Sequence, residues 1–248
     1  MKILKYQKLK DNRYEVILDD GDKVTLYDDI IIRYNLLIKK EVSKNELTLI
    51  LEENDKLFYY FLAIKYLGKK LRSEKEIIEY LKKKEASDEL IKLTVNHLKE
   101  NHLLDDEQFV KAYINDQLSF TLKGPYKIQK ELINLGINEE LITQYLDYDN
   151  EIFKEHLESF INKKVKTNHR LSKNNLLKKL RVDIYNMGYD VGNIDMINID
   201  IDDSVIIKKE YDKLLKKYQN KENRDYLIKN ELYKKGYNLE DINNILEQ

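Results

Sequence analysis

Residues 123–146 read KGPYKIQKELINLGINEELITQYL, and residues 223–246, one hundred positions later, read NRDYLIKNELYKKGYNLEDINNIL. Aligned without gaps, the two stretches share nine identical residues, including the glycines Gly136 and Gly236. Self-similarity at a fixed spacing indicates tandem structural repeats, and missing it leads to a wrong fold assignment. The sequence therefore predicts a repeat architecture.

Weaker copies of the same pattern lie about fifty residues to either side of residues 123–146, as expected for short repeats. The matching positions are Ile77, Leu81, Ile91 and Val95 before this stretch, and Leu180, Ile184, Gly188 and Ile194 after it. This register predicts a distinct segment followed by four repeats, over residues 1–55, 56–106, 107–155, 156–207 and 208–248.

Each repeat is predicted to hold three helices. Gly136, Gly188 and Gly236 follow the middle helix, where a left-handed residue commonly ends a helix. Asn138 and Asn238 fit the N-caps of the third helices. Three short helices bury too little apolar surface to be stable alone, so neighbouring repeats must stack. The predicted fold is mainly α: about four tandem three-helix repeats in an elongated, curved array.

The N-terminal segment is predicted to be a small β-hairpin and helix unit. Extended patterns cover residues 2–9, 13–18 and 23–27, with a turn signal at Asp20-Gly21-Asp22. We expect Asp28 or Asp29 to cap a short helix through Leu37. A second helix is expected to begin near Ser43, where Glu46 completes the capping-box pattern.

The composition is that of a charged helical protein. The 248 residues include one proline and no cysteine, so disulfides, thiolate nucleophiles and cysteine–zinc sites are excluded. Charged residues make up 36% of the chain, yet the formal net charge is only −1. The first ten residues lack the apolar run of a signal peptide, and no uncharged stretch approaches the length of a membrane span. We expect a cytoplasmic protein without membrane contact.

Catalytic and metal-binding motifs are missing from the sequence. There is no Walker A or GxGxxG pattern to bind phosphate. The four histidines do not lie at ligand spacing from other candidate ligands. The aspartates of NIDMINIDIDDS (residues 193–204) lack the glycine of a calcium loop, and this stretch is interpreted as a linker closing the third repeat. We expect no cofactor, no metal and no enzymatic activity.

Charge alternates in blocks along the repeats. Residues 56–84 carry nine Lys or Arg against three Glu, residues 85–107 carry seven acids against two lysines, and residues 154–181 return to nine Lys or Arg against two Glu. Most single lysines merely solvate a helix face. Blocks of alternating sign predict a basic surface near successive helix N-termini, suited to phosphates or acidic proteins. Tyr66, Tyr80 and Tyr126 are candidates for stacking on bases, although tyrosines more often pack in a core.

Three consecutive stretches carry a resemblance to a known family. YLGKKLRSEKEIIEYLKKK, LKENHLLDDEQFVKAYINDQ and KGPYKIQKELINLGI, in this order and spacing, resemble the RecX family of RecA regulators, best over residues 56–150. The N-terminal segment is similar to the extension of longer members from low-GC Gram-positive bacteria. The resemblance implies tandem three-helix repeats that bind RecA and its filament on single-stranded DNA. It also implies control, with inhibition expected, of recombinase, ATPase and SOS-linked activities. Many members have three repeats, so a fourth leaves the docking of residues 208–248 open.

The candidate partner-binding or DNA-binding residues are basic and lie where the middle helices begin. Ser73 and Glu76 fit a capping box at the first of these helix starts, with neighbouring cations expected to point away from the core. Gly124 and Pro125 fit the cap and first residue of the equivalent helix in the second repeat. The full set of candidates is Lys65, Lys69, Lys70, Arg72, Lys75, Lys123, Lys127 and Arg224.

Two alternatives remain open at the level of sequence. A nucleic-acid-binding protein acting without RecA would bind DNA alone with a steep salt dependence. A helical-repeat scaffold would bind some other protein and leave RecA unaffected. The sequence does not distinguish inhibition, capping, disassembly or stimulation of the filament, and it leaves open which face binds. We expect a monomer.

Overall fold

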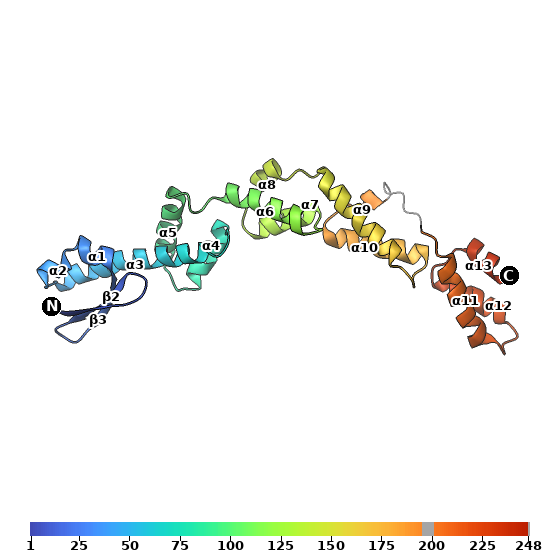
Figure 1. The fold of residues 1–248 in the computed structure, drawn as a ribbon, viewed down its shortest axis with the longest axis horizontal. Coiled ribbons are helices and arrows are strands. Elements are labelled where there is room, and N and C mark those ends of the chain that lie inside the picture. Colours follow the sequence, from blue (N-terminus) through green and yellow to red (C-terminus); the bar gives the residue numbers. More distant parts are fainter. Residues whose placement is uncertain (195–200, 248) are drawn as a thin grey trace. The chain divides into compact units, whose positions relative to one another are not determined.

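The computed structural model describes residues 1–194 and 201–247 and is mainly helical, with one small sheet at the N-terminus (Figure 1). The third-repeat linker predicted over residues 193–204 lies partly outside the described residues. The elements are β1 (Ile3–Lys8), β2 (Arg13–Leu18), β3 (Lys23–Tyr27), α1 (Asp28–Arg33), α2 (Leu36–Lys39), α3 (Lys44–Leu67), α4 (Glu74–Lys82), α5 (Asp88–Glu100), α6 (Asp106–Phe120), α7 (Pro125–Asn134), α8 (Glu139–Tyr145), α9 (Glu151–Lys166), α10 (Lys173–Met187), the 3₁₀-helix η1 (Val191–Ile194), α11 (Ser204–Tyr218), α12 (Arg224–Lys234) and α13 (Leu239–Leu246).

The three predicted N-terminal strands form an antiparallel sheet in the order β1-β2-β3. Asn54 of α3 is buried against the free edge of β3. Its amide accepts the Tyr27 N–H at 3.0 Å and donates to the Thr25 carbonyl at 3.1 Å. The Asn54 side chain therefore bonds to two backbone groups of β3 that would otherwise be free to pair with another strand. This protects the exposed edge of the sheet from pairing with another chain.

The short helix after the sheet differs from its prediction. Tyr27 occupies the N-cap position of α1 without a side-chain bond, and Asp28 is the first helical residue. α1 ends at Arg33 because Asn35 adopts a left-handed conformation (φ +52°), which asparagine tolerates better than most residues. Ser43 caps α3 as predicted, since its Oγ accepts the Glu46 N–H.

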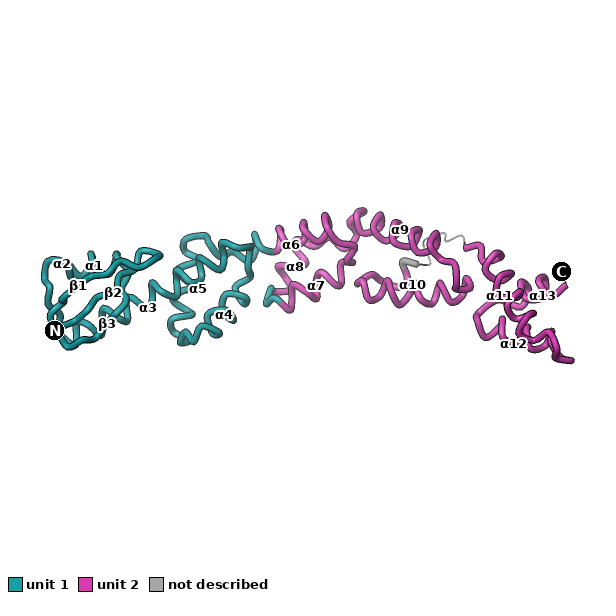
Figure 2. The backbone as a smooth tube through the Cα atoms, turned by 60° about the horizontal axis from the view of Figure 1, so that its bottom comes forward, with its two compact units in different colours: residues 1–109, 135–137 teal, residues 110–134, 138–248 magenta. Residues whose placement is uncertain are grey.

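α3 extends across the boundary expected between residues 55 and 56. Its first half supplies Ile50 to the core of the N-terminal unit, and its second half supplies Ala63 to the core of the first repeat. The sheet unit and the first repeat therefore share one uninterrupted helix. The chain divides into two compact units, unit 1 (residues 1–109 and 135–137) and unit 2 (residues 110–134 and 138–248), shown in Figure 2.

The first helices of the second, third and fourth repeats start at Asp106, Glu151 and Ser204. The cap residue sets the first of these starts, since the Asp105 carboxylate accepts the N–H groups of the second and third residues of α6. In the third repeat, the described residues after α10 contain η1 instead of a third α-helix.

The predicted helix ends are confirmed. Gly136, Gly188 and Gly236 have φ angles of +85°, +86° and +83°, and they follow α7, α10 and α12. The side chains of Asn138 and Asn238 accept backbone N–H groups at the starts of α8 and α13. Local sequence signals therefore place the turn that follows each of these three middle helices.

A recurring joint links each middle helix to the turn that ends the next one. The Ser73 hydroxyl before α4 donates to the Leu135 carbonyl at 2.7 Å, and the Ser172 hydroxyl before α10 donates to the Lys235 carbonyl at 2.8 Å. The accepting carbonyl in each case belongs to the residue just before a left-handed glycine. These bonds span 62 and 63 residues of sequence, so they tie one repeat to the next.

A further joint, the second along the chain, lies between α7 and α10, where the Tyr126 N–H donates to the Gly188 carbonyl. At all three joints the left-handed glycine lies very close to a residue of the preceding repeat. A Cβ added at Gly136 would lie 2.8 Å from Lys75 Cβ, and one at Gly188 would lie 2.3 Å from Lys127 Cβ. One at Gly236 would lie 2.8 Å from Asn175 Oδ1. In all three joints the neighbouring residue precedes its glycine by 61 positions. Glycine is therefore favoured at these positions for two reasons: it adopts the left-handed backbone conformation without strain, and it has no Cβ to clash with the neighbouring residue.

In the first and third joints an aspartate carboxylate accepts the N–H of the first residue of the middle helix, and in the second joint no such bond is possible. The N–H of Glu74 donates to Asp106 at 3.1 Å, and the N–H of Lys173 donates to Asp203 at 2.6 Å. Pro125 stands at the equivalent first position of α7 and has no N–H to donate. There, Gly124 bonds directly through its N–H to the Met187 carbonyl at 2.7 Å.

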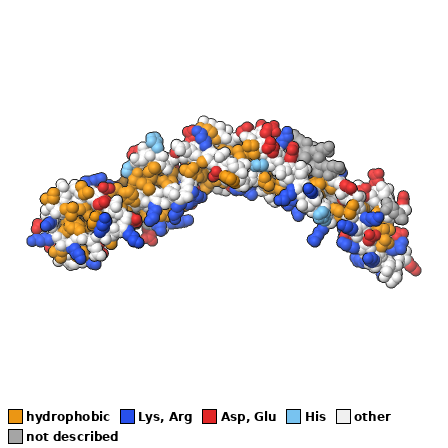
Figure 3. Space-filling model, in the orientation of Figure 1, with side chains coloured by type: hydrophobic (Ala, Val, Ile, Leu, Met, Phe, Trp, Pro, Cys, Tyr) orange, Lys and Arg blue, Asp and Glu red, His pale blue; other side chains and the backbone are white. Residues whose placement is uncertain are grey.

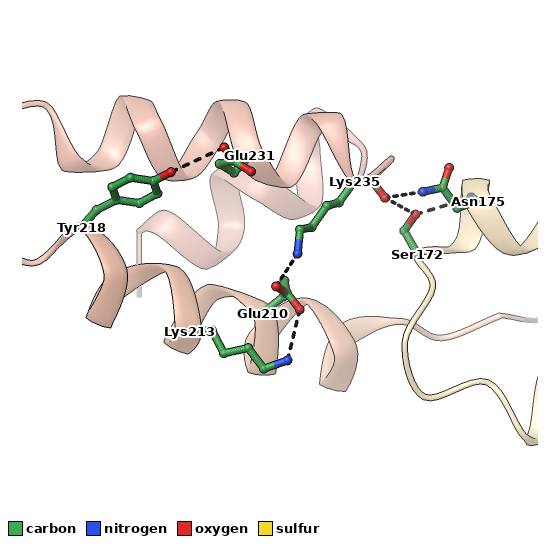
Figure 4. Close-up of polar contacts among 7 residues, drawn as sticks. All are labelled: Ser172, Asn175, Glu210, Lys213, Tyr218, Glu231 and Lys235. Atoms are coloured by element: carbon green, nitrogen blue, oxygen red, sulfur yellow. Dashed lines mark hydrogen bonds and ion pairs between the residues drawn. The ribbon is translucent and has the colours of Figure 1, made fainter.

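Both the backbone carbonyl and the side chain of Lys235 stabilise the joint between the third and fourth repeats. Its carbonyl accepts hydrogen bonds from Ser172 and from the Asn175 side chain, and its ammonium group pairs with Glu210 of α11 (Figure 4). Lys213 also pairs with Glu210, at 3.4 Å. The same residue thus connects α10 of the third repeat to α11 of the fourth.

Candidate partner-binding surface

The start of α4 is built on a complete capping box. Ser73 is fully buried, its Oγ accepts the Glu76 N–H, and the Glu76 carboxylate accepts the Ser73 N–H. Ile77 and Leu81 of α4 are buried in the first-repeat core. The turn before Ser73 is therefore held rigidly at the surface, and Lys and Arg side chains lie over this region at the lower edge of the view in Figure 3.

Arg72 does not point outward as predicted. Only 14% of its side chain is exposed, and its guanidinium pairs with Glu76 at 2.7 Å. It also lies 4.1 Å from the centre of the Tyr66 ring. Tyr66 in turn stacks on Tyr80, with ring centres 4.0 Å apart. Arg72 is thus part of the packing, because a planar guanidinium is suited to stacking and ion pairing together. Arg72 and Tyr80 thus cover the ring of Tyr66, and Tyr66 covers one face of Tyr80.

The exposed charge at this turn comes from the neighbouring lysines. Lys70 remains exposed while its Nζ lies 3.6 Å from Glu76, and Lys65 is exposed with its Nζ 3.7 Å from Asp11. Lys69 is exposed and forms no ion pair with any residue that the structure describes. The stem of Lys75 packs on the glycine of the joint. Of this cluster, Lys69 and Lys70 offer charge to a partner most directly.

Lys123, at the start of α7, is engaged internally. Its Nζ lies 2.7 Å from Glu131, which also accepts the Tyr113 hydroxyl at 2.7 Å. Burial alone would raise the pKa of Glu131, but these two hydrogen bonds and the positive charges of Lys123 and Lys127 together outweigh burial and lower the pKa below its usual value. Lys123 is therefore held by a glutamate of its own repeat, as Arg72 is.

The remaining two candidates lie apart from each other. Lys127 packs its stem against Gly188, and its Nζ donates to the Asn186 carbonyl at 3.3 Å. Arg224, the first residue of α12, is exposed and pairs with its neighbour Asp225 at 3.0 Å. Within unit 2, Lys123 and Lys127 share one helix start, and Arg224 stands at another.

The candidate residues named from the sequence do not include a second set of exposed cations. Around the turn between α9 and α10 lie six exposed basic side chains that form no ion pair among the described residues. They are Lys163, Lys166, Arg170, Lys173, Lys178 and Lys179. The excess of nine basic residues over two acidic ones in residues 154–181 was the signal that could have identified them. Figure 3 shows Lys and Arg over this turn.

The described residues contain no group of three or more His, Asp or Glu side chains placed to hold a metal ion. No helix in the described part of the chain has the length and apolar character needed to cross a membrane.

Comparison with known proteins gives consistent results. Residues 60–98 match the family model for the RecX first three-helix domain, and residues 105–146 match that for the second. A regulatory protein RecX of Oceanobacillus iheyensis is 32% identical, covering 98% of this chain and 95% of its own. Another, of Streptococcus pneumoniae serotype 19F, is 33% identical, covering 100% and 99%.

Solved structures support the fold. A crystal structure of regulatory protein RecX aligns with a TM-score of 0.63 at 22% identity, covering 79% of this chain and 98% of that one. RecX from Lactobacillus salivarius aligns with a TM-score of 0.54 at 23% identity, covering 58% and 94%. At these identities the likeness concerns the arrangement of helices alone.

Proposed function

The chain belongs to the RecX family, and from that premise we propose that it binds the RecA recombinase and the RecA filament on single-stranded DNA. It acts there as a cytoplasmic monomer without catalysis of its own, and it inhibits the recombinase, ATPase and SOS-linked activities of RecA. The observation that carries this proposal is the relationship to regulatory RecX proteins over nearly the whole chain.

The surface at the start of α4 is the first contact that we propose. Lys69 and Lys70 are exposed on a turn whose backbone is fixed by the Ser73 capping box. Fixed cations favour binding to a filament that displays acidic side chains and phosphates. Arg72 supports this surface from beneath by holding Glu76 and Tyr66 in place.

Direct binding to nucleic acid is the second candidate function. The six exposed cations around the α9–α10 turn favour it, since unpaired amines on one hairpin suit a phosphate backbone. This candidate predicts tight binding to single-stranded DNA in the absence of RecA, with an affinity that falls steeply as salt is raised.

The proposal is tested by the single-stranded-DNA-dependent ATPase rate of the cognate RecA, titrated with this protein at fixed DNA. A change well below one protein per RecA indicates capping or interference with filament growth. A change only near stoichiometric coverage indicates occupation along the filament. An unchanged rate, with no co-sedimentation with the filament, would refute the proposal and favour a scaffold for another partner.

Charge reversal sharpens this test. Lys69→Glu combined with Lys70→Glu should weaken filament binding roughly tenfold at moderate salt, because two exposed charges change sign. Lys209→Glu combined with Lys216→Glu on α11 provides the control, since it reverses the same number of exposed lysines in the fourth repeat. Equal effects of the two variants would show that overall charge, and not the α4 turn, determines binding.

A further inference from the structure

A groove of about 600 Å³ lies in unit 2 beside the joint between α7 and α10. Its lining includes Tyr126, Lys127, Lys130, Tyr185, Asn186 and Asp190. The joint fixes its shape, because the Tyr126 N–H donates to the Gly188 carbonyl at 3.1 Å and Lys127 Nζ donates to the Asn186 carbonyl. Hydrogen bonds of the repeat joint therefore hold the two walls of the groove in place.

The groove walls expose large aromatic surface. Tyr126 is 53% exposed and Tyr185 is 69% exposed, from two helices that are far apart in sequence. Tyrosine is enriched among the residues that contribute most to protein–protein binding, because its ring buries apolar area while its hydroxyl stays polar. Two exposed tyrosines facing one groove are thus typical of a docking site for a protein segment.

Basic residues flank these rings. Lys130 is exposed and has no ion pair among the described residues. Val182 and Lys178 precede Tyr185 by three and seven residues, which places all three on the same face of α10. Val182 and Lys178 are exposed as well. An exposed strip of apolar and cationic side chains on α10 therefore leads away from the groove at Tyr185.

We propose that this groove docks an acidic segment of a protein partner. Apolar side chains of the segment pack between Tyr126 and Tyr185, and its carboxylates pair with Lys130 and Lys178. The proposal rests on the proposed function, in which the partner is RecA, and adds the surface of this chain that receives it. Opposite charge at the rim of such a site fixes the orientation of the partner and speeds its association.

A protein segment fits this groove better than single-stranded DNA does. Tyr148 packs at 5.6 Å against the Tyr126 ring, so one side of that ring is occupied. Asp190 also lines the groove. A peptide can place neutral residues beside Asp190, whereas a nucleic acid brings a phosphate with every nucleotide. The net charge of −1 also disfavours general binding of polyanions.

The fourth repeat supplies a matched control. Tyr226 occupies the position equivalent to Tyr126, one hundred residues later, and it is 64% exposed. It is not part of the groove lining. Removing either ring should disturb folding little, since both lie at the surface near the start of a helix.

The first experiment measures equilibrium binding of the full chain to two probes, the cognate RecA filament on oligo(dT) and oligo(dT) alone. The double variant Tyr126→Ala, Tyr185→Ala should weaken filament binding at least about tenfold, as truncation of central aromatic residues does in protein interfaces. Tyr226→Ala should change it less than about twofold, as most peripheral truncations do. Circular dichroism checks that the variants remain folded.

A second pair of variants tests the charges. Lys130→Glu with Lys178→Glu should weaken filament binding, and raising salt should reduce the difference from wild type, because exposed ion pairs are screened. If wild type binds filaments and both groove variants bind equally well, the groove proposal is refuted while the proposed function stands. If wild type does not bind filaments, the proposed function itself fails. If the groove variants lose binding to oligo(dT) alone, the occupant is nucleic acid and the proposal is overturned.

Discussion

Replacing Gly188 by alanine tests the joint between repeats most directly. Gly188 has φ +86°, and a Cβ there would lie 2.3 Å from Lys127 Cβ and 2.4 Å from the Lys127 backbone nitrogen. The left-handed conformation alone costs alanine about 1–2 kcal/mol. Overpacking against a rigid neighbour adds about 1–3 kcal/mol, so we expect a total of about 2–5 kcal/mol.

Gly21 is the control that separates these two contributions. It has φ +91°, and a Cβ added there would meet nothing within 4 Å. Gly21→Ala should therefore cost only the conformational part, about 1–2 kcal/mol. The difference between the two variants measures the close contact at the joint.

The assay is amide hydrogen exchange followed by mass spectrometry, with urea unfolding by circular dichroism alongside it. Gly188→Ala should speed exchange at Gly124 and Tyr126, whose N–H groups bond to the residues at this joint. A local loss of about 2 kcal/mol corresponds to roughly thirtyfold faster exchange. If exchange at the start of α7 is unchanged, or if Gly188→Ala costs no more than Gly21→Ala, the proposed role of the joint is wrong.

Three further predictions concern single polar side chains. Ser73→Ala should lower the free energy of unfolding by about 1–2 kcal/mol, measured by urea denaturation, because the helix loses its cap and the Leu135 carbonyl loses its donor. Asn54→Leu should cost about 2–4 kcal/mol by the same measurement, since two backbone groups of β3 lose their partner. Glu131 has a folded-state pKa below that of the unfolded chain, so the stability it contributes is present above the unfolded pKa and is lost as pH falls through the folded pKa. Glu131→Gln should flatten this part of the stability-against-pH curve, and an unaltered curve would contradict the assignment.

Much of the local structure could be predicted because it depends on residues within one helical turn. The left-handed glycines, the Asn138 and Asn238 caps and the Ser73 capping box each follow from two or three nearby residues. The repeat register follows from identical residues one hundred positions apart. The resemblance to the RecX family rested on three stretches of sequence within residues 66–137, and the relatives then established it.

The candidate surface could be predicted only in part. Basic residues do gather at the start of α4, but Arg72 pairs with Glu76 and does not point outward as predicted, and Lys123 pairs with Glu131. Sequence gives the sign of a side chain's charge but does not give its partner. Glu76 and Glu131 determine where these two cations lie, because a half-buried charge is stable only when paired.

The sequence by itself determined the helical repeats, their caps and their left-handed turns, because backbone conformation at those sites is a local property. Tertiary structure alone decided that Ser73 bonds to Leu135, and that Tyr126 and Tyr185 share a groove although 59 residues separate them. The physical reason is close packing at the joints. Which side chains meet there depends on how tightly two repeats approach, and a glycine without a Cβ sets that distance.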